Sequence, residues 1–159
     1  MALVQPRKLE ERLKREAEKR GIPLEELIVE VLSKALNNPL SREDEVELHL
    51  KLAEKYLREA EDLLAKGDYV EVSEKGWSAV VQVVKALATR EGKEIKSHRE
   101  LIWYIHDLAE KLRDPEIRYL WSRSLELHQN FYENWMHPED VVLALRDARK
   151  LVEKLRKHL

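Results

Sequence analysis

The segment DYVEVSEKGWSAVVQVVKALATR, residues 68–90, decides the fold of this chain. Valine, alanine, leucine and tryptophan occupy most sides of the helix that this segment would form. A helix that is apolar on nearly all sides is normally buried, so we predict the central helix of a helical bundle. Gly76 lies within it, and glycine costs about 1 kcal/mol relative to alanine inside a helix. We therefore expect a neighbouring helix to approach closely there.

Helix start signals outline four further helices of the same bundle. Serine caps, a capping box and two prolines at first-turn positions mark the starts. The predicted segments run from Ser41 to about residue 66, from Ser97 to about residue 112, from Pro115 to about residue 135, and from Pro138 to the end. Five helices joined by short breaks predict an all-α, up-and-down bundle over residues 41–159.

A short helical hairpin is predicted before the bundle, within residues 1–40. Its two amphipathic helices, residues 6–20 and 23–37, are parted by Gly21 and Pro23. Two such short helices cannot bury both apolar stripes by themselves. We expect this appendage to pack on the bundle or on another copy of itself.

Composition narrows the class of protein. The 29 Lys and Arg residues nearly balance 31 Asp and Glu residues, so the net charge of -2 predicts no general attraction to nucleic acid or membrane. Cysteine is absent, and no apolar segment is long enough to cross a bilayer, so we expect a cytoplasmic protein without disulfides. Abundant Lys and Glu favour a thermophilic source.

Several classes of site have no sequence pattern here. A glycine-rich phosphate loop and a nucleophile elbow are both missing, which argues against P-loop, Rossmann and α/β-hydrolase chemistry. The histidines lack partners at metal-ligand spacing. We expect neither a metal nor another cofactor.

The predicted helix from Pro115 to about residue 135 holds the candidate site. At about 100° per residue, one face of it is apolar and aromatic with a histidine in the middle. That face comprises Ile117, Leu120, Trp121, Ser124, His128, Phe131 and Trp135. A lone histidine on such a face is more often a satisfied core residue than a catalyst, so both interpretations stay open.

The remaining histidines are assigned no chemistry. His98 lies in the capping segment of its helix and is interpreted as structural. His49, His137 and His158 are interpreted as surface or helix-end residues.

Two resemblances involve this helix. Arg123 and His128 are separated by four residues, with Phe131, Tyr132 and later Glu139-Asp140 following, and this resembles the Arg-x4–6-His pattern of HEPN-type RNases. A wider resemblance is to the archaeal PaREP family, which is itself HEPN-like. It rests on residues 67–70, 73–75 with Trp77, 84–88, 97–101 and 127–135.

The resemblance implies a HEPN-like bundle with RNA- or nucleotide-directed activity, in its most specific form a metal-independent endoribonuclease. His128 would handle a proton of the reaction and Arg123 would stabilise the charged phosphate, with Ser124 and Tyr132 in support. It also implies a homodimer with composite sites, RNA as a partner and a protein partner of the toxin–antitoxin type. Five positions on one straight helix place Arg123 and His128 about 140° apart, so a helix bend or a second chain must complete the site.

Two alternatives remain. Many active HEPN RNases have Asn or Asp directly after the arginine, whereas this chain has Ser124, so a non-catalytic helical interaction module is the first. The second is DNA binding through the basic hairpin, because residues 7–20 carry an excess of three positive charges and distantly resemble ribbon-helix-helix proteins. A solvated helix face that docks on the bundle also explains those charges.

Overall fold

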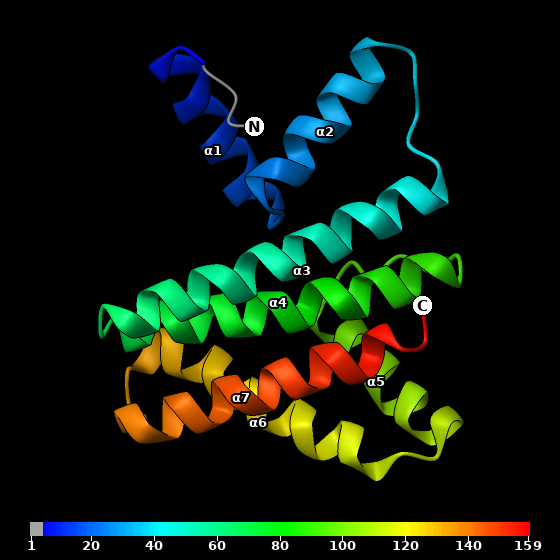
Figure 1. The fold of residues 1–159 in the computed structure, drawn as a ribbon. Coiled ribbons are helices and arrows are strands. Elements are labelled where there is room, and N and C mark those ends of the chain that lie inside the picture. The colour runs from blue at the N-terminus through cyan, green and yellow to red at the C-terminus, as the bar shows by residue number, and fades with distance from the viewer. Residues whose placement is uncertain (1–4) are drawn as a thin grey trace. The chain divides into compact units, whose positions relative to one another are not determined.

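The computed structural model describes residues 5–159 and confirms the predicted all-α fold (Figure 1). Within those residues every regular element is an α-helix, and none has the length and apolar character required to cross a bilayer. The helices are α1 (Arg7–Arg20), α2 (Leu24–Ala35), α3 (Arg42–Ala65), α4 (Tyr69–Arg90), α5 (His98–Leu112), α6 (Pro115–Glu133) and α7 (Pro138–Arg156).

The chain divides into two compact units. The first ends at Ser41 and contains the α1–α2 hairpin, and the second, Arg42–Leu159, contains α3 to α7. In the hairpin, Gly21 ends α1 in the left-handed conformation, at φ 65°. Ala17 and Leu27 are the buried side chains of its two helices.

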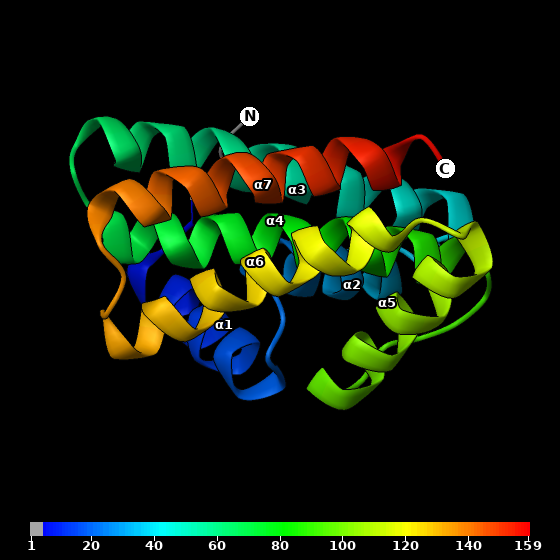
Figure 2. The same ribbon diagram turned by 90° about the horizontal axis from the view of Figure 1, so that it is seen from below.

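Helix α4 is the centre of the bundle, as its composition predicts. It contacts α3, α5, α6 and α7 (Figure 2). Val72, Val80 and Val83 have no exposed surface. Because α4 buries residues on nearly every side, each of the other four helices can cover its own apolar stripe by packing on or near it.

The bundle also buries two polar pairs that connect α4 to its neighbours. His49 of α3 shares a 2.7 Å hydrogen bond with Gln82, so its interpretation as a surface residue is wrong. On the other side, Asn130 of α6 donates from Nδ2 to Ser73 Oγ at 2.8 Å. Buried polar groups require such partners, which fixes how α3 and α6 are placed along α4.

The buried face of α6 differs from the predicted one in its second half. Leu127 and Asn130 are buried there, whereas His128 and Phe131 are only half-buried and Trp135 is 53% exposed, beyond the end of the helix. The reason is the contact of Leu127 and Asn130 with α4, which turns His128 to the edge of the packed face. The predicted apolar face of this helix therefore placed His128 too deep in the core.

Gly76 confirms the predicted close approach. A Cβ atom at this position would lie 3.0 Å from Leu127 Cδ1 of α6 and 3.1 Å from Leu145 Cδ1 of α7. Both leucines are at least 97% buried, so neither can move freely into solvent. Gly76 thus lets two helices approach α4 at one level.

We expect Gly76→Ala to destabilise the bundle by about 1 kcal/mol, because overpacking outweighs the gain in helix propensity. The measurement is urea unfolding of four proteins: wild type, Gly76→Ala, Leu127→Ala and the double variant. Leu127→Ala removes one of the two close contacts of the new methyl group, so Gly76→Ala should cost less in that background. The same cost in both backgrounds would show that the contact with Leu127 is not the cause.

Candidate functional site

His128 lies at the edge of the interface between α6 and α4. Its ring stacks on the indole of Trp77, with ring centroids 4.5 Å apart and planes inclined by 24°. The ring of Tyr132, one turn further along α6, meets His128 edge-on at 5.4 Å. Aromatic rings therefore contact His128 on two sides, and the residue is half-buried rather than enclosed.

His98, interpreted from the sequence as a structural residue of the capping segment, is the second histidine of this cluster. It is the first residue of α5, is exposed to solvent, and stacks on His128 with ring centroids 5.2 Å apart. Its ring also lies 5.8 Å from that of Trp77. Two imidazoles from different helices thus share one partly open site.

The spacing of the two histidines from the turn between α5 and α6 could have predicted this pair from the sequence. Helices α5 and α6 contact one another, and only Arg113 and Asp114 lie between them. His98 precedes Arg113 by 15 residues (113 − 98) and His128 follows it by 15 (128 − 113). Residues equally far from the turn of an antiparallel helix pair lie at the same level.

Burial lowers the pKa of His128 below its ordinary value of 6.5, and the charge of nearby His98 lowers it further. Both causes disfavour the imidazolium form. At neutral pH, His128 is consequently a neutral imidazole that can accept a proton.

Arg123 faces a different neighbour. Its Nε lies 3.2 Å from Asp147 Oδ2 of α7, and its guanidinium also pairs with Glu126. Burial opposes its charge, but these two carboxylates raise its pKa above the usual value. Since α6 is helical throughout from Pro115 to Glu133, no break turns Arg123 toward His128, and the two residues keep separate partners within this chain.

Ser124 and Tyr132, the two predicted supporting residues, lie in different environments. Ser124 is fully buried, and its hydroxyl donates to the carbonyl oxygen of Leu120 at 3.0 Å, so it serves the helix rather than a ligand. Tyr132 is 72% exposed beside His128. Of the four sequence-predicted site residues, only His128 and Tyr132 are brought together.

Asn130 holds this end of α6 in position. While its Nδ2 donates to Ser73, its Oδ1 accepts from the backbone N–H groups of Trp135 at 2.9 Å and Met136 at 2.7 Å. One buried amide therefore ends α6, directs the following turn and anchors both to α4. Because it lies midway between His128 and Tyr132 in the sequence, it also positions the aromatic cluster.

Comparison with protein families places this arrangement in a known group. The model of the archaeal PaREP1/PaREP8 family matches residues 48–152. The chain belongs to the archaeal PaREP1/PaREP8 family. The matched region includes His98, His128 and the whole of α4 to α6, and does not include the α1–α2 hairpin. A comparison with curated proteins found no match.

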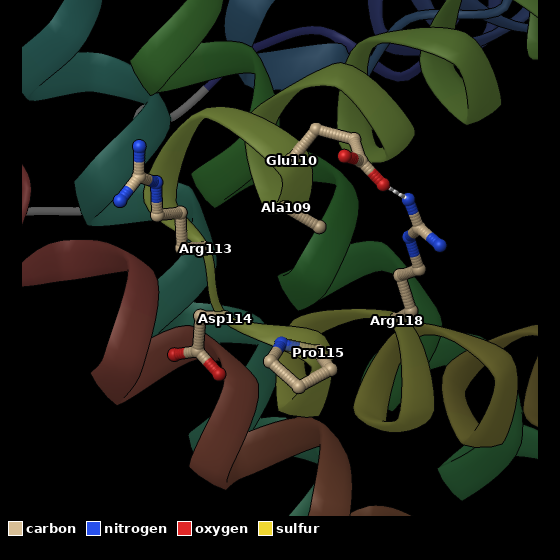
Figure 3. Close-up of a pocket in the computed structure, with 6 residues that line it drawn as sticks. All are labelled: Ala109, Glu110, Arg113, Asp114, Pro115 and Arg118. Carbon is tan, nitrogen blue, oxygen red and sulfur yellow. Dashed lines mark hydrogen bonds and ion pairs between the residues drawn. The ribbon is translucent and has the colours of Figure 1, made fainter.

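One surface hollow in this PaREP1/PaREP8 bundle lies at the turn between α5 and α6 (Figure 3). The histidines belong to the opposite ends of these two helices. It measures about 290 Å³ and is lined by Ala109, Glu110, Arg113, Asp114, Pro115 and Arg118. Glu110 pairs with Arg118 across it, and Asp114 pairs with Lys154 at 2.6 Å. Three of the lining charges are thus paired, and no histidine is among the six lining residues, so the hollow offers no comparable acid–base pair.

The described part of the chain, residues 5–159, contains no group of three or more His, Asp or Glu side chains arranged to hold a metal ion.

The lowered pKa of His128 predicts a pH dependence of stability. An unfolded chain binds a proton on this imidazole more readily than the folded one, so the stabilisation is present above pH 6.5 and is lost as pH falls through the folded-state pKa. His128→Phe, which keeps an aromatic ring on Trp77, should lose less stability than wild type between pH 7.5 and about 5, a window above most carboxylate titration. Urea unfolding at both pH values measures this.

His106→Phe is the matched control, because His106 is an exposed residue of α5. It should keep the wild-type dependence. An unchanged pH dependence in His128→Phe would contradict the assigned pKa shift.

Proposed function

We propose that this PaREP1/PaREP8 protein cleaves single-stranded RNA without a metal ion, with His128 and His98 as the acid–base pair. The observation that carries the proposal is the stacking of the two imidazoles at 5.2 Å, one half-buried and one exposed. General acid–base catalysis requires two groups that hold and release protons near neutral pH, which histidine does best.

In the reaction, neutral His128 accepts the proton of a ribose 2′-hydroxyl, and the freed oxygen attacks the adjacent phosphorus. The bond from phosphorus to the 5′-oxygen breaks, and His98, in its protonated form, donates a proton to that oxygen. The products are a 2′,3′-cyclic phosphate and a free 5′-hydroxyl, so atoms and charges balance.

The developing negative charge is stabilised by the start of α5 in this proposal. His98 and Arg99 are its first two residues, after the Ser97 cap, and backbone N–H groups at a helix start attract phosphate. The exposed guanidinium of Arg99 lies over the ring of Trp103 at 5.7 Å and adds a positive charge beside His98. Arg123, which the resemblance would assign to this task, instead acts as a brace between α6 and α7.

The direct test is cleavage of single-stranded RNA in the presence of a chelator. His128→Ala and His98→Ala should each lower the rate by about 100-fold or more, the usual contribution of general acid–base catalysis. His106→Ala, an exposed histidine on the same α5 helix, should cleave like wild type. Circular dichroism establishes that all variants remain helical.

Arg123→Ala separates this proposal from the HEPN-type assignment. If Arg123 braces two helices, the variant should be less stable but still cleave at a temperature where it is folded. Equal cleavage by wild type and His128→Ala, or no cleavage by wild type, would reject the enzyme. The second candidate, a non-catalytic interaction module, would then be favoured, and the occupation of Arg123 by Asp147 and Glu126 supports it.

We also propose that the protein forms a homodimer, as the resemblance to HEPN-type RNases implies. Three exposed aromatic side chains on or just after α5 and α6 favour a contact with a second copy: Trp103 at 58%, Tyr132 at 72% and Trp135 at 53% exposure. Light scattering after gel filtration should give twice the monomer mass of 18.9 kDa.

Trp103→Gln with Trp135→Gln should shift that mass toward the monomer, whereas Tyr119→Gln, another exposed aromatic on α6, should not. A monomeric wild type would reject the dimer and leave the histidine pair testable by itself.

A further inference from the structure

The α1 helix carries a straight row of four basic side chains that the proposed RNA cleavage does not use. Lys8, Arg12, Arg15 and Lys19 are all exposed. Their spacing of four, three and four residues places them within an arc of about 60° on one side of the helix. Ala17, the buried residue of α1, lies roughly opposite.

Among the residues that the structure describes, the other basic residues of α1 form ion pairs with acidic partners, and these four do not. Arg7 pairs with Glu11 at 2.9 Å, Lys14 with Glu10 at 2.7 Å, and Arg20 with Glu30 at 2.8 Å. Within the described range 5–159, no ion pair involves a member of the row. The positive charges that remain unneutralised on α1 are thus gathered on the face directed away from its packing partner.

The carboxylates of α1 lie outside this row. Glu16 lies about 40° beyond Arg12 at one edge of the row and Glu18 about 60° beyond Arg15 at the other, and Glu10 and Glu11 are held by their partners. The row itself contains only Lys and Arg along about 16 Å of helix. A row of regularly spaced cations with no anion between them is electrostatically complementary to a line of regularly spaced anions.

We propose that this row binds the phosphate backbone of one strand of nucleic acid, without regard to base sequence. A single strand presents one line of phosphates, which a narrow row can follow, whereas a helix in a duplex groove meets phosphates at both edges. The row consists of Lys and Arg alone, and contacts of these side chains with phosphate oxygens carry no sequence information. This surface lies outside residues 48–152, which the family model matches.

The test compares binding of a short, labelled oligouridylate by fluorescence anisotropy. Both proteins carry His128→Ala, so that cleavage cannot affect the result, and one also carries Lys8→Gln, Arg12→Gln, Arg15→Gln and Lys19→Gln. Glutamine keeps helix propensity while removing charge. Four lost phosphate contacts should reduce the slope of log affinity against log salt by about 3. Between about 50 and 200 mM salt, the protein with the intact row should lose about 50-fold more affinity.

A matched control neutralises four exposed basic residues of the bundle instead: Lys66, Arg90, Arg146 and Lys157. This control has the same net charge and should bind like the protein with the intact row. Equal loss in both variants, or unchanged binding in the row variant, would overturn the proposal.

Two further binding measurements identify the partner. Tighter binding of duplex DNA than of the oligouridylate would overturn the single-strand assignment. Row-dependent binding to vesicles of phosphatidylserine without binding to the oligouridylate would assign the row to anionic membranes and overturn nucleic acid. Failure of RNA cleavage leaves this test unaffected, because both proteins carry His128→Ala and differ only in the row.

Discussion

The rest of the bundle depends on one constraint, the need to bury α4 on nearly all of its sides. A helix with a single apolar stripe is satisfied by one neighbour, whereas α4 requires several. The missing side chain at Gly76 lets α6 and α7 approach together, and Leu127 and Leu145 fill the space that a larger residue would take. The hydrophobic effect drives this packing, and the steric gap at Gly76 decides where it is closest.

Polar contacts then determine how far each helix slides along that centre. Apolar packing tolerates small shifts, but a buried amide without its partner costs about 1–3 kcal/mol. Asn130 satisfies Ser73 of α4 together with two backbone N–H groups after α6, and few positions of α6 allow all three contacts. The position of His128 on the Trp77 ring follows from this placement, because His128 lies two residues before Asn130 on a rigid helix.

The elements of this fold were largely predictable, since their signals are local. The caps at Ser97 and the prolines at 115 and 138 act within one turn, and the buried stripe of α7 follows simple helical periodicity. The burial of His49 was missed because its partner Gln82 belongs to another helix. The depth of His128 was overestimated because the side of α6 that faces α4 depends on Leu127 and Asn130. The separation of Arg123 from His128 was predictable from helix geometry, but the carboxylate of Asp147 that holds Arg123 was not.

The equal distance of His98 and His128 from Arg113 has an evolutionary consequence. Exposed turns usually tolerate insertions and deletions, so their lengths vary among relatives. Here one added or lost residue within α5 or α6, between the turn and either histidine, would rotate that histidine by about 100° and move it about 1.5 Å along its helix. Relatives that keep the pair can therefore tolerate substitutions at the 29 positions between the two histidines (128 − 98 − 1) far more readily than insertions or deletions there.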